Sequence, residues 1–151
     1  MTLASRSKDY VFVGIQFALF GAYALEFPAL SFSRPSVFGY VGLFLALSGV
    51  GTGVLALLQL NTSLSPFPTP VANGELVTTG VFALARHPIY TSLLLAAFGY
   101  ALYLGSGYRM LIGLALLVLF YFKSSYEESL LSARYPGYAE YRKRVGRFTP
   151  W

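Results

Sequence analysis

The chain has 151 residues, of which 56% are hydrophobic and 11% are charged, and its formal net charge is +5. A soluble domain usually carries about 25% charged residues, so this composition predicts a single membrane-embedded unit with little soluble mass. The chain contains no cysteine and one histidine, which excludes disulfides and a catalytic thiol and argues against a metal centre. Nucleic-acid binding usually needs a basic patch on a soluble domain, and this composition predicts no such domain, which argues against that function.

Four apolar stretches are long enough, or nearly so, to cross a bilayer as helices, which takes about 20 residues. Their approximate bounds are Tyr10–Leu30, Val37–Leu60, Pro88–Leu104 and Tyr108–Phe122. The links at 33–36 and 105–107 are short, so each pair of stretches is predicted to form an antiparallel helical hairpin. The glycine-rich residues 49–53 favour close helix packing over a nucleotide-binding motif, because no strand precedes them.

The basic residues orient this arrangement. Of the 11 lysines and arginines, Arg34 and Arg109 fall on one side of the bundle and the other nine fall on the opposite side. Because cytoplasmic loops are enriched in basic residues, both termini and the loop at 61–87 are predicted to lie in the cytoplasm. Four compact spans with minimal loops suggest a prokaryotic inner membrane.

The expected fold is therefore all-α and integral to the membrane, with four transmembrane helices in two antiparallel hairpins and a cytoplasmic helical tail. This single domain, residues 1–151, comprises a first hairpin (1–60), a cytoplasmic loop (61–87), a second hairpin (88–123) and the tail (124–151). Alternate prolines between residues 66 and 70 favour an extended segment that lies on the cytoplasmic face. In the tail, Pro136 and Gly137 separate two helices, and a packing stripe is predicted at Leu131, Tyr135, Tyr138, Tyr141 and Val145.

Five consecutive residues at the start of the third stretch carry much of the polar chemistry: Arg86, His87, Pro88, Ile89 and Tyr90. Pro88 suits the first turn of a helix, where its missing N–H costs nothing. The unpaired N–H groups of that turn and the helix dipole attract negative charge, and Arg86 and His87 stand beside them. This turn is therefore predicted to bind an anionic group such as a carboxylate or a phosphate.

Three charged residues follow the fourth stretch. Lys123 and Glu127 lie four residues apart on one helix face, a spacing that suits an ion pair, and Glu128 lies on a neighbouring face. A carboxylate at the membrane surface is costly unless it is paired, so these acids are candidate site residues. Because a hairpin brings the start of the third helix and the end of the fourth to the same depth, His87 and Glu127 are predicted to border one pocket, open to water and to lipid.

Four ordered blocks in the C-terminal half resemble the isoprenylcysteine carboxyl methyltransferase family, within a wider group that includes phospholipid N-methyltransferases. The blocks are residues 76–82, residues 86–90, Lys123 with Glu127 and Glu128, and residues 135–145. The resemblance implies an S-adenosylmethionine-dependent methyltransferase built from membrane helices, with residues 61–87 as a cofactor loop. Its cofactor-binding residues would be Gly74, Glu75, Leu76, Val77, Phe82, His87, Pro88, Ile89, Tyr90 and Glu127.

The residues themselves agree with this cofactor. Its carboxylate suits Arg86 and His87, its amino group suits Glu127 or Glu128, and its sulfonium suits an aromatic face such as Tyr90. Lys123 aligns with the family arginine that recognises the acceptor's carboxylate, and it keeps the charge but loses the bidentate fork. Phe82 stands where the family has a tyrosine. The candidate catalytic residues are therefore Lys123, Glu127 and Glu128, with Glu128 as the base that an amine acceptor would require.

Methyl transfer needs alignment and the exclusion of water, and it requires no metal. The expected partners are membrane lipid and a lipophilic or lipidated acceptor: a prenylcysteine carboxylate, a phospholipid amine or a small hydrophobic nucleophile. Two alternatives stay open. Sterol reductases carry a related Arg-His-Pro-x-Tyr block and bind NADPH, and a non-enzymatic membrane partner protein would bind no cofactor. The sequence does not indicate an oligomeric state.

Overall fold

A computed structural model describes residues 3–60, 65–70 and 74–150, and within them the side chains from residue 7 onward. The described residues form five α-helices, joined by the 3-10 turns η1 (Pro28–Leu30) and η3 (Gly80–Ala83). The α-helices are α1 (Leu3–Ala24), α2 (Ser36–Leu60), α3 (Pro88–Leu104), α4 (Gly107–Arg134) and α5 (Tyr138–Arg144). The described ranges contain no β-structure beyond one isolated bridge between Ser31 and Ser106, so the all-α prediction is confirmed.

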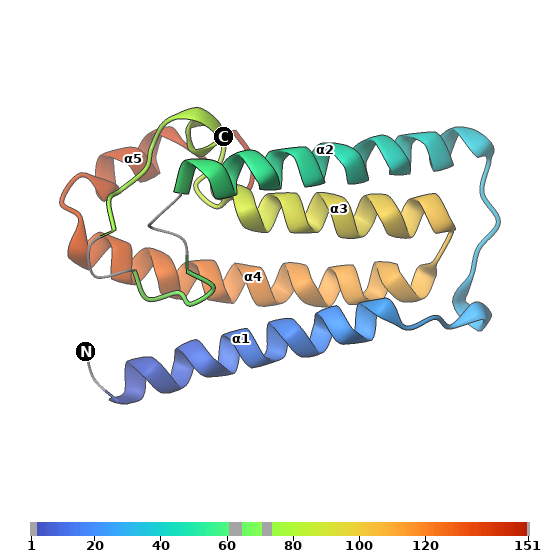
Figure 1. The fold of residues 1–151 in the computed structure, drawn as a ribbon, viewed down its shortest axis with the longest axis horizontal. Coiled ribbons are helices and arrows are strands. Elements are labelled where there is room, and N and C mark those ends of the chain that lie inside the picture. Colours follow the sequence, from blue (N-terminus) through green and yellow to red (C-terminus); the bar gives the residue numbers. More distant parts are fainter. Residues whose placement is uncertain (1–2, 61–64, 71–73, 151) are drawn as a thin grey trace.

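The four long helices lie side by side in the order α2, α3, α4, α1 (Figure 1). One end of this bundle, here called the loop end, holds α5, the segments 65–70 and 74–87, and the beginning of α1. The opposite end, the far end, holds the tight turn between α3 and α4. In that turn Gly105 adopts the left-handed conformation (φ 67°) that glycine accepts without strain, and the Ser106 hydroxyl caps α4 by accepting from the Arg109 N–H.

Helices α3 and α4 form the second hairpin, as predicted. The prediction of a first hairpin, made of α1 and α2, is wrong. Helices α1 and α2 do not pack on each other: α2 packs on α3, and α1 packs on α4 at the opposite side (Figure 1). The reason lies in the link between them, residues 25–35. This link crosses the far end, where the N–H of Phe32 donates to the carbonyl of Gly105 (2.8 Å). It therefore runs over the α3–α4 turn instead of reversing directly.

Two of the described helices, α2 and α4, are long and apolar enough to cross a membrane, and α3 is apolar but has 17 residues. Four spans therefore stay a prediction. The tail has the predicted two helices, since α4 continues to Arg134 as a polar extension and α5 follows Pro136 and Gly137. Residues 61–64 and 71–73 of the loop lie outside the described residues.

Helices α2 and α3 approach each other through glycines. A Cβ built on Gly99 would lie 2.5 Å from the Ala46 nitrogen and 2.6 Å from the Gly42 carbonyl oxygen, and one on Gly49 would lie 2.7 Å from the Ser92 carbonyl oxygen. No side chain fits at such distances, so glycine permits the contact. The predicted packing role of residues 49–53 holds for Gly49, whereas a Cβ on Gly51 would meet nothing within 4 Å.

We expect Gly99→Ala to lower the free energy of unfolding by about 1–3 kcal/mol, because the added methyl group forces the two helix backbones apart. Gly51→Ala is the matched control, and it should cause no loss because its methyl group enters open space. Thermal unfolding of both variants in the same detergent checks this. Equal melting temperatures for the two variants would contradict the close-packed interface.

Candidate active site

The start of α3 is fixed by two distant segments. Near its entry, Gly80 (φ 61°) lies against the side chain of Gln59, whose Oε1 accepts from the Val81 N–H (3.1 Å). The N–H groups of Arg86 and His87 donate to the carbonyls of Gly146 (2.9 Å) and Arg147 (3.0 Å). The C-terminal segment therefore already pairs the backbone donors that precede Pro88.

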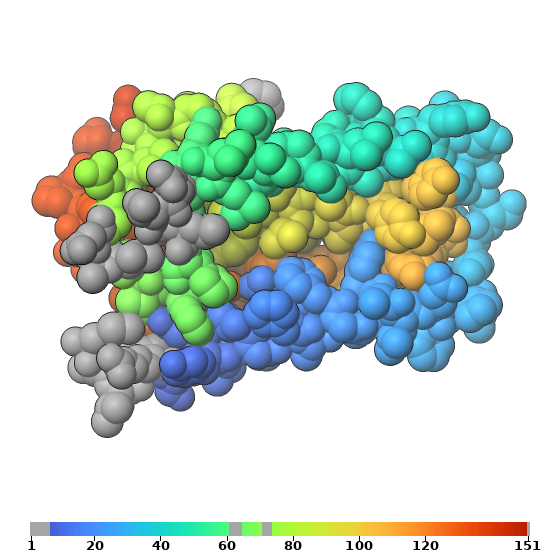
Figure 2. Space-filling view, in the orientation of Figure 1, coloured from blue at the N-terminus to red at the C-terminus, as the bar shows by residue number. Residues whose placement is uncertain are grey.

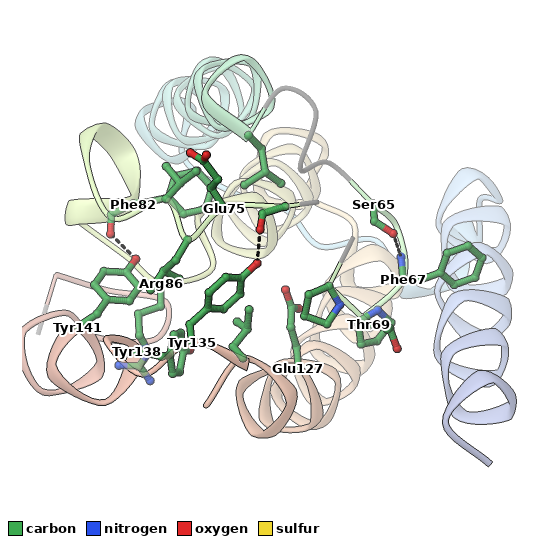
Figure 3. A pocket seen from close by; sticks show the side chains of 17 residues that line it. Ser65, Phe67, Thr69, Glu75, Phe82, Arg86, Glu127, Tyr135, Tyr138 and Tyr141 are labelled. Atoms are coloured by element: carbon green, nitrogen blue, oxygen red, sulfur yellow. Dashed lines mark hydrogen bonds between the residues drawn. The ribbon is translucent and has the colours of Figure 1, made fainter. Parts of the chain in front are cut away.

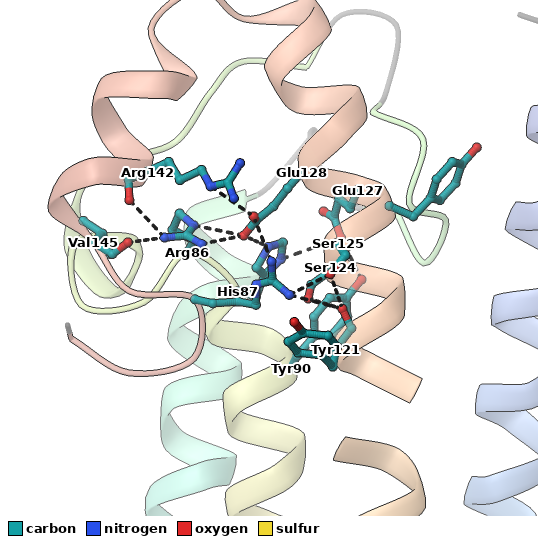
Figure 4. A network of polar contacts seen from close by, with 12 residues as sticks. Arg86, His87, Tyr90, Tyr121, Ser124, Ser125, Glu127, Glu128, Arg142 and Val145 are labelled. Carbon is teal, nitrogen blue, oxygen red and sulfur yellow. Dashed lines mark hydrogen bonds and ion pairs between the residues drawn. The ribbon is translucent and has the colours of Figure 1, made fainter. Parts of the chain in front are cut away.

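The buried carboxylate of Glu128 gathers four basic side chains from three parts of the chain (Figure 4). Its Oε1 accepts from Arg86 Nε (3.0 Å), Arg86 Nη2 (2.8 Å) and His87 Nε2 (3.2 Å). Its Oε2 lies 3.3 Å from Arg147 Nη2 and 3.7 Å from Arg142 Nε. The Arg86 and Glu128 side chains are 8% and 3% exposed, so the centre of this cluster, here called the Glu128 cluster, is shielded from solvent.

Two sequence-based expectations change as a result. Arg86 was expected to attract a ligand anion, but its remaining donor Nη1 bonds the carbonyls of Val145 and Arg142. Glu128 was expected to act on the acceptor, but it lines none of the cavities described below. Arg86 and Glu128 form an ion pair with each other, because a buried charge is costly without a partner. Their ion pair joins the entry of α3 to α4.

His87 and Tyr90 connect this cluster to Glu127. The Tyr90 hydroxyl donates to Glu127 Oε2 (2.8 Å), and His87 Nδ1 lies 3.7 Å from the same oxygen. The His87 and Tyr90 rings stack at 5.4 Å, and Tyr90 stacks in turn on Phe120 at 4.8 Å. Two residues at the beginning of α3 therefore hold the Glu127 carboxylate. The predicted proximity of Glu127 to His87 is confirmed.

Lys123 does not form the expected ion pair with Glu127. Its ammonium donates instead to Gln16 Oε1 (2.6 Å) and to the carbonyl of Pro66 (2.9 Å), and it lies 5.4 Å from the centre of the Tyr90 ring. Lys123 is buried. Its hydrogen-bond partners come from α1 and from the segment 65–70, so both elements pack against α4 at Lys123.

A cavity of about 290 Å³, here called the chamber, lies between the end of α2, the beginning of α3 and the part of α4 that carries Lys123 and Glu127. It joins charged groups to aliphatic side chains, which suits an amphiphilic ligand. Its lining residues are Gln16, Leu57, Leu60, Ser65, Pro66, Phe82, Arg86, His87, Pro88, Ile89, Tyr90, Leu93, Lys123 and Glu127.

A second cavity of about 100 Å³, here called the loop cavity, lies beneath the segments 65–70 and 74–77 (Figure 3). It adjoins the chamber, because Glu127, Phe82 and Arg86 line both. The family-derived candidates divide between the two: Gly74, Glu75, Leu76 and Val77 line the loop cavity, and His87, Pro88, Ile89 and Tyr90 line the chamber.

Tyrosines of the predicted packing stripe form the outer wall of the loop cavity. Tyr138, Tyr141 and Val145 form a buried cluster, as expected. The hydroxyls of Tyr135 and Tyr141 donate to the carbonyls of Gly74 and Phe82, both at 2.5 Å. Burial raises the pKa of Tyr141 to about 12, although Arg86 opposes the shift, so its phenol keeps the proton that it donates.

Two buried hydroxyls of residues that line the loop cavity have no hydrogen-bond partner within the described part of the chain. They are Tyr138 OH and Thr69 Oγ1. Burial also raises the pKa of Tyr138, so its hydroxyl stays a donor. A buried polar group without a partner is costly, so a polar ligand that reached these two hydroxyls would remove that cost.

The sequence profile of the phospholipid methyltransferase family matches residues 36–137, which is more than half of the chain. The chain belongs to the phospholipid methyltransferase family. Membership implies a methyltransferase, and together with the two apolar helices it supports association with a membrane. Among curated proteins, none matches the chain.

The part matched to the phospholipid methyltransferase family runs from α2 to the end of α4. Helices α1 and α5 lie outside it, yet α1 supplies Gln16 to Lys123 and α5 supplies Tyr138 and Tyr141 to the loop cavity. Sequence reasoning missed Gln16, although an amide within an apolar stretch is a usable signal. It could not find the pairing of the C-terminal carbonyls with residues 86 and 87, since backbone groups leave no trace in the sequence.

We expect Glu128→Ala to lower the free energy of unfolding by about 3–5 kcal/mol, because it leaves Arg86 and its basic neighbours without their buried counter-charge. Glu140→Ala is the matched control: its carboxylate is exposed and pairs with Lys143 on the surface, so the loss should stay below about 1 kcal/mol. Thermal unfolding of both variants tests this, and similar melting temperatures would contradict a structural role for the cluster.

Proposed function

We propose that the chain is an S-adenosylmethionine-dependent membrane methyltransferase that acts on a lipophilic acceptor. The observation that carries the proposal is the position of Glu127, which lines both the loop cavity and the chamber. Glu127 thus borders the loop cavity, which has two hydroxyls without partners among the described residues. It also borders the chamber, which has the ammonium of Lys123 and aliphatic walls. A site for cofactor and acceptor side by side needs such an arrangement.

The residues of the loop cavity fit the cofactor. Its positively charged sulfonium and amino groups suit the carboxylates of Glu127 and Glu75, and Tyr90 would contribute through its hydroxyl, which holds Glu127. Its carboxylate and ribose suit donors such as Tyr138 OH and Thr69 Oγ1. When bound, S-adenosylmethionine supplies a methyl group on a positively charged sulfur. The proposed contacts also include Gly74, Leu76, Val77, Phe82, His87, Pro88 and Ile89.

The chain's own residues would align the two ligands and exclude water. Tyr90 fixes the orientation of Glu127 through its 2.8 Å hydrogen bond, and the Glu128 cluster holds His87 in place. The segment 65–70 contributes Ser65 to both cavities and covers them at the loop end. Alignment and exclusion of water are the principal requirements of a displacement at a methyl group.

Lys123 would bind the anionic group of the acceptor. Its hydrogen-bond partners, Gln16 and the Pro66 carbonyl, are neutral oxygens. The charges of Glu127 and Asp9 act on its ammonium without forming an ion pair, so Lys123 can still attract an anion. A carboxylate, as in a prenylcysteine, would be both the anion and the nucleophile. In a phospholipid amine, the phosphate would bind Lys123 and the amine would lie near Glu127, which could accept its proton.

We further propose the topology expected from the basic residues: four spans, with the loop end in the cytoplasm of a prokaryotic cell. Arg86, Lys123, Arg142 and Arg147 all lie at the loop end, and Arg34 and Arg109 lie at the far end. This separation supports the proposal, because positive charge accumulates on the cytoplasmic side of membrane proteins.

We expect the purified protein to bind S-adenosylmethionine and not NADPH, as measured by equilibrium binding of each labelled cofactor. Glu127→Gln should weaken the binding of S-adenosylmethionine about tenfold to a hundredfold, because it removes a charge-assisted contact. Glu26→Gln, at the far end, is the matched control and should bind normally. Binding of NADPH alone would favour the reductase alternative, and binding of neither cofactor would overturn the proposal.

We expect Lys123→Met to raise the KM for an anionic lipid acceptor about tenfold or more and to leave the affinity for S-adenosylmethionine unchanged. Lys123→Arg should restore most of the loss because it keeps the charge. A methyltransferase assay with prenylcysteine and phospholipid acceptors, run beside cofactor binding, provides the measurement. Equal activity of the Met and Arg variants would show that the charge of Lys123 does not recognise the acceptor.

A further inference from the structure

A third cavity, of about 330 Å³, lies along the middle of the bundle and is here called the apolar groove. Figure 2 shows it as a trough between α1 and α2, with α3 at its floor. It exists because α1 packs on α4 and leaves α2 and α3 uncovered on this side. Its lining residues are Phe20, Tyr23, Ala46, Val50, Leu93, Ala96, Ala97, Tyr100 and Leu116.

The groove continues the chamber. Leu93 lines both spaces, and α1 borders both, with Gln16 on the chamber and Phe20 and Tyr23 on the groove. From Gln16 to Tyr23 the helix rises about 10 Å. About 10 Å of α1 therefore separates Gln16, which holds the ammonium of Lys123, from Tyr23, and apolar side chains line the groove in between.

At the end nearer the far end of the bundle, a hydrogen bond between α1 and α3 closes the groove. The Tyr23 hydroxyl reaches from α1 to α3 and donates to the carbonyl of Ala97 (2.6 Å). Behind it, the guanidinium of Arg109 lies 5.9 Å from the Tyr23 ring and 5.8 Å from the Tyr100 ring, and it pairs with Glu26 at 3.1 Å. A hydrocarbon chain that displaced these contacts would leave buried polar groups unpaired, which is costly.

We propose that the groove holds one hydrocarbon chain of the acceptor and that Tyr23 sets the longest chain it can bury. This inference rests on the proposed function, because it places the acceptor's anionic end at Lys123. We infer a hydrocarbon chain as the occupant because the groove adjoins the chamber at Leu93. The chamber holds charged groups and the groove is apolar, which matches a lipid with an anionic end. The rise from Gln16, which holds Lys123, to Tyr23 corresponds to about an octyl chain. Longer chains leave sideways, between α1 and α2.

Tyr23 lies on α1, which precedes the residues matched to the family, so the family match carries no information about this limit. Tyr23 is a specificity-determining residue. It acts by closing the groove and takes no part in methyl transfer.

The test measures how butyl, octyl and dodecyl phosphate displace a dansyl-labelled fatty acid from the full-length protein held in amphipol. In the unaltered protein, affinity should rise about fourfold for each methylene group that the groove buries, and should level off beyond octyl phosphate. In Tyr23→Ala the rise should continue to dodecyl phosphate. In Val50→Trp, which fills the groove midway, it should stop before octyl phosphate.

Val41→Trp is the matched control. Val41 is exposed and lies on α2 about two and a half turns from Val50, which places it on the opposite helix face. This variant should keep the chain-length limit of the unaltered protein. The inference is overturned if the limit is the same in Tyr23→Ala and Val50→Trp as in the unaltered protein, or if Val41→Trp shifts it equally.

Binding of S-adenosylmethionine to the same samples separates the two proposals. Cofactor binding with an unchanged chain-length limit would leave the methyltransferase and remove the role of Tyr23. A limit that shifts as expected without cofactor binding would retain the lipid groove and remove the proposed activity.

Discussion

The ion pair between Arg86 and Glu128 is the interaction on which the loop end depends. Both side chains are almost fully buried, so neither charge is tolerable without the other. Through this pair the entry to α3 is tied to α4, and through Arg142 and Arg147 the tail is tied to both. The position of His87 follows, and with it the orientation of Tyr90 and of the Glu127 carboxylate that Tyr90 holds.

Two adjacent glutamates serve different purposes because of helix geometry. Successive residues of an α-helix point about 100° apart, so Glu128 turns toward the arginines while Glu127 turns toward the cavities. The ion pairs that stabilise the site therefore use Glu128, and the carboxylate of Glu127 still faces the cavities. The same division explains why Arg86, although it lines the chamber, has its donors already satisfied.

The bundle is tight on one side and open on the other. Glycines bring α2 and α3 into backbone contact, whereas α1 touches α4 and leaves a trough beside α2. The tight interface fixes the depth at which α3 begins, and the trough gives a lipophilic molecule a path to that depth. The fold thereby connects a polar chamber to apolar surroundings, as the proposed methyl transfer to a lipophilic acceptor requires.

The sequence by itself determined the helix bounds from α2 onward, the turn at Gly105 and the meeting of His87 with Glu127. These depend on apolar periodicity, a short link and helix-terminating residues, which act between neighbours in the chain. Tertiary structure alone decided that α1 packs on α4, that Gln16 holds Lys123, and that Glu128 binds Arg86 instead of facing a ligand. The partner of a charge depends on which groups share its burial, and burial is a property of the assembled bundle.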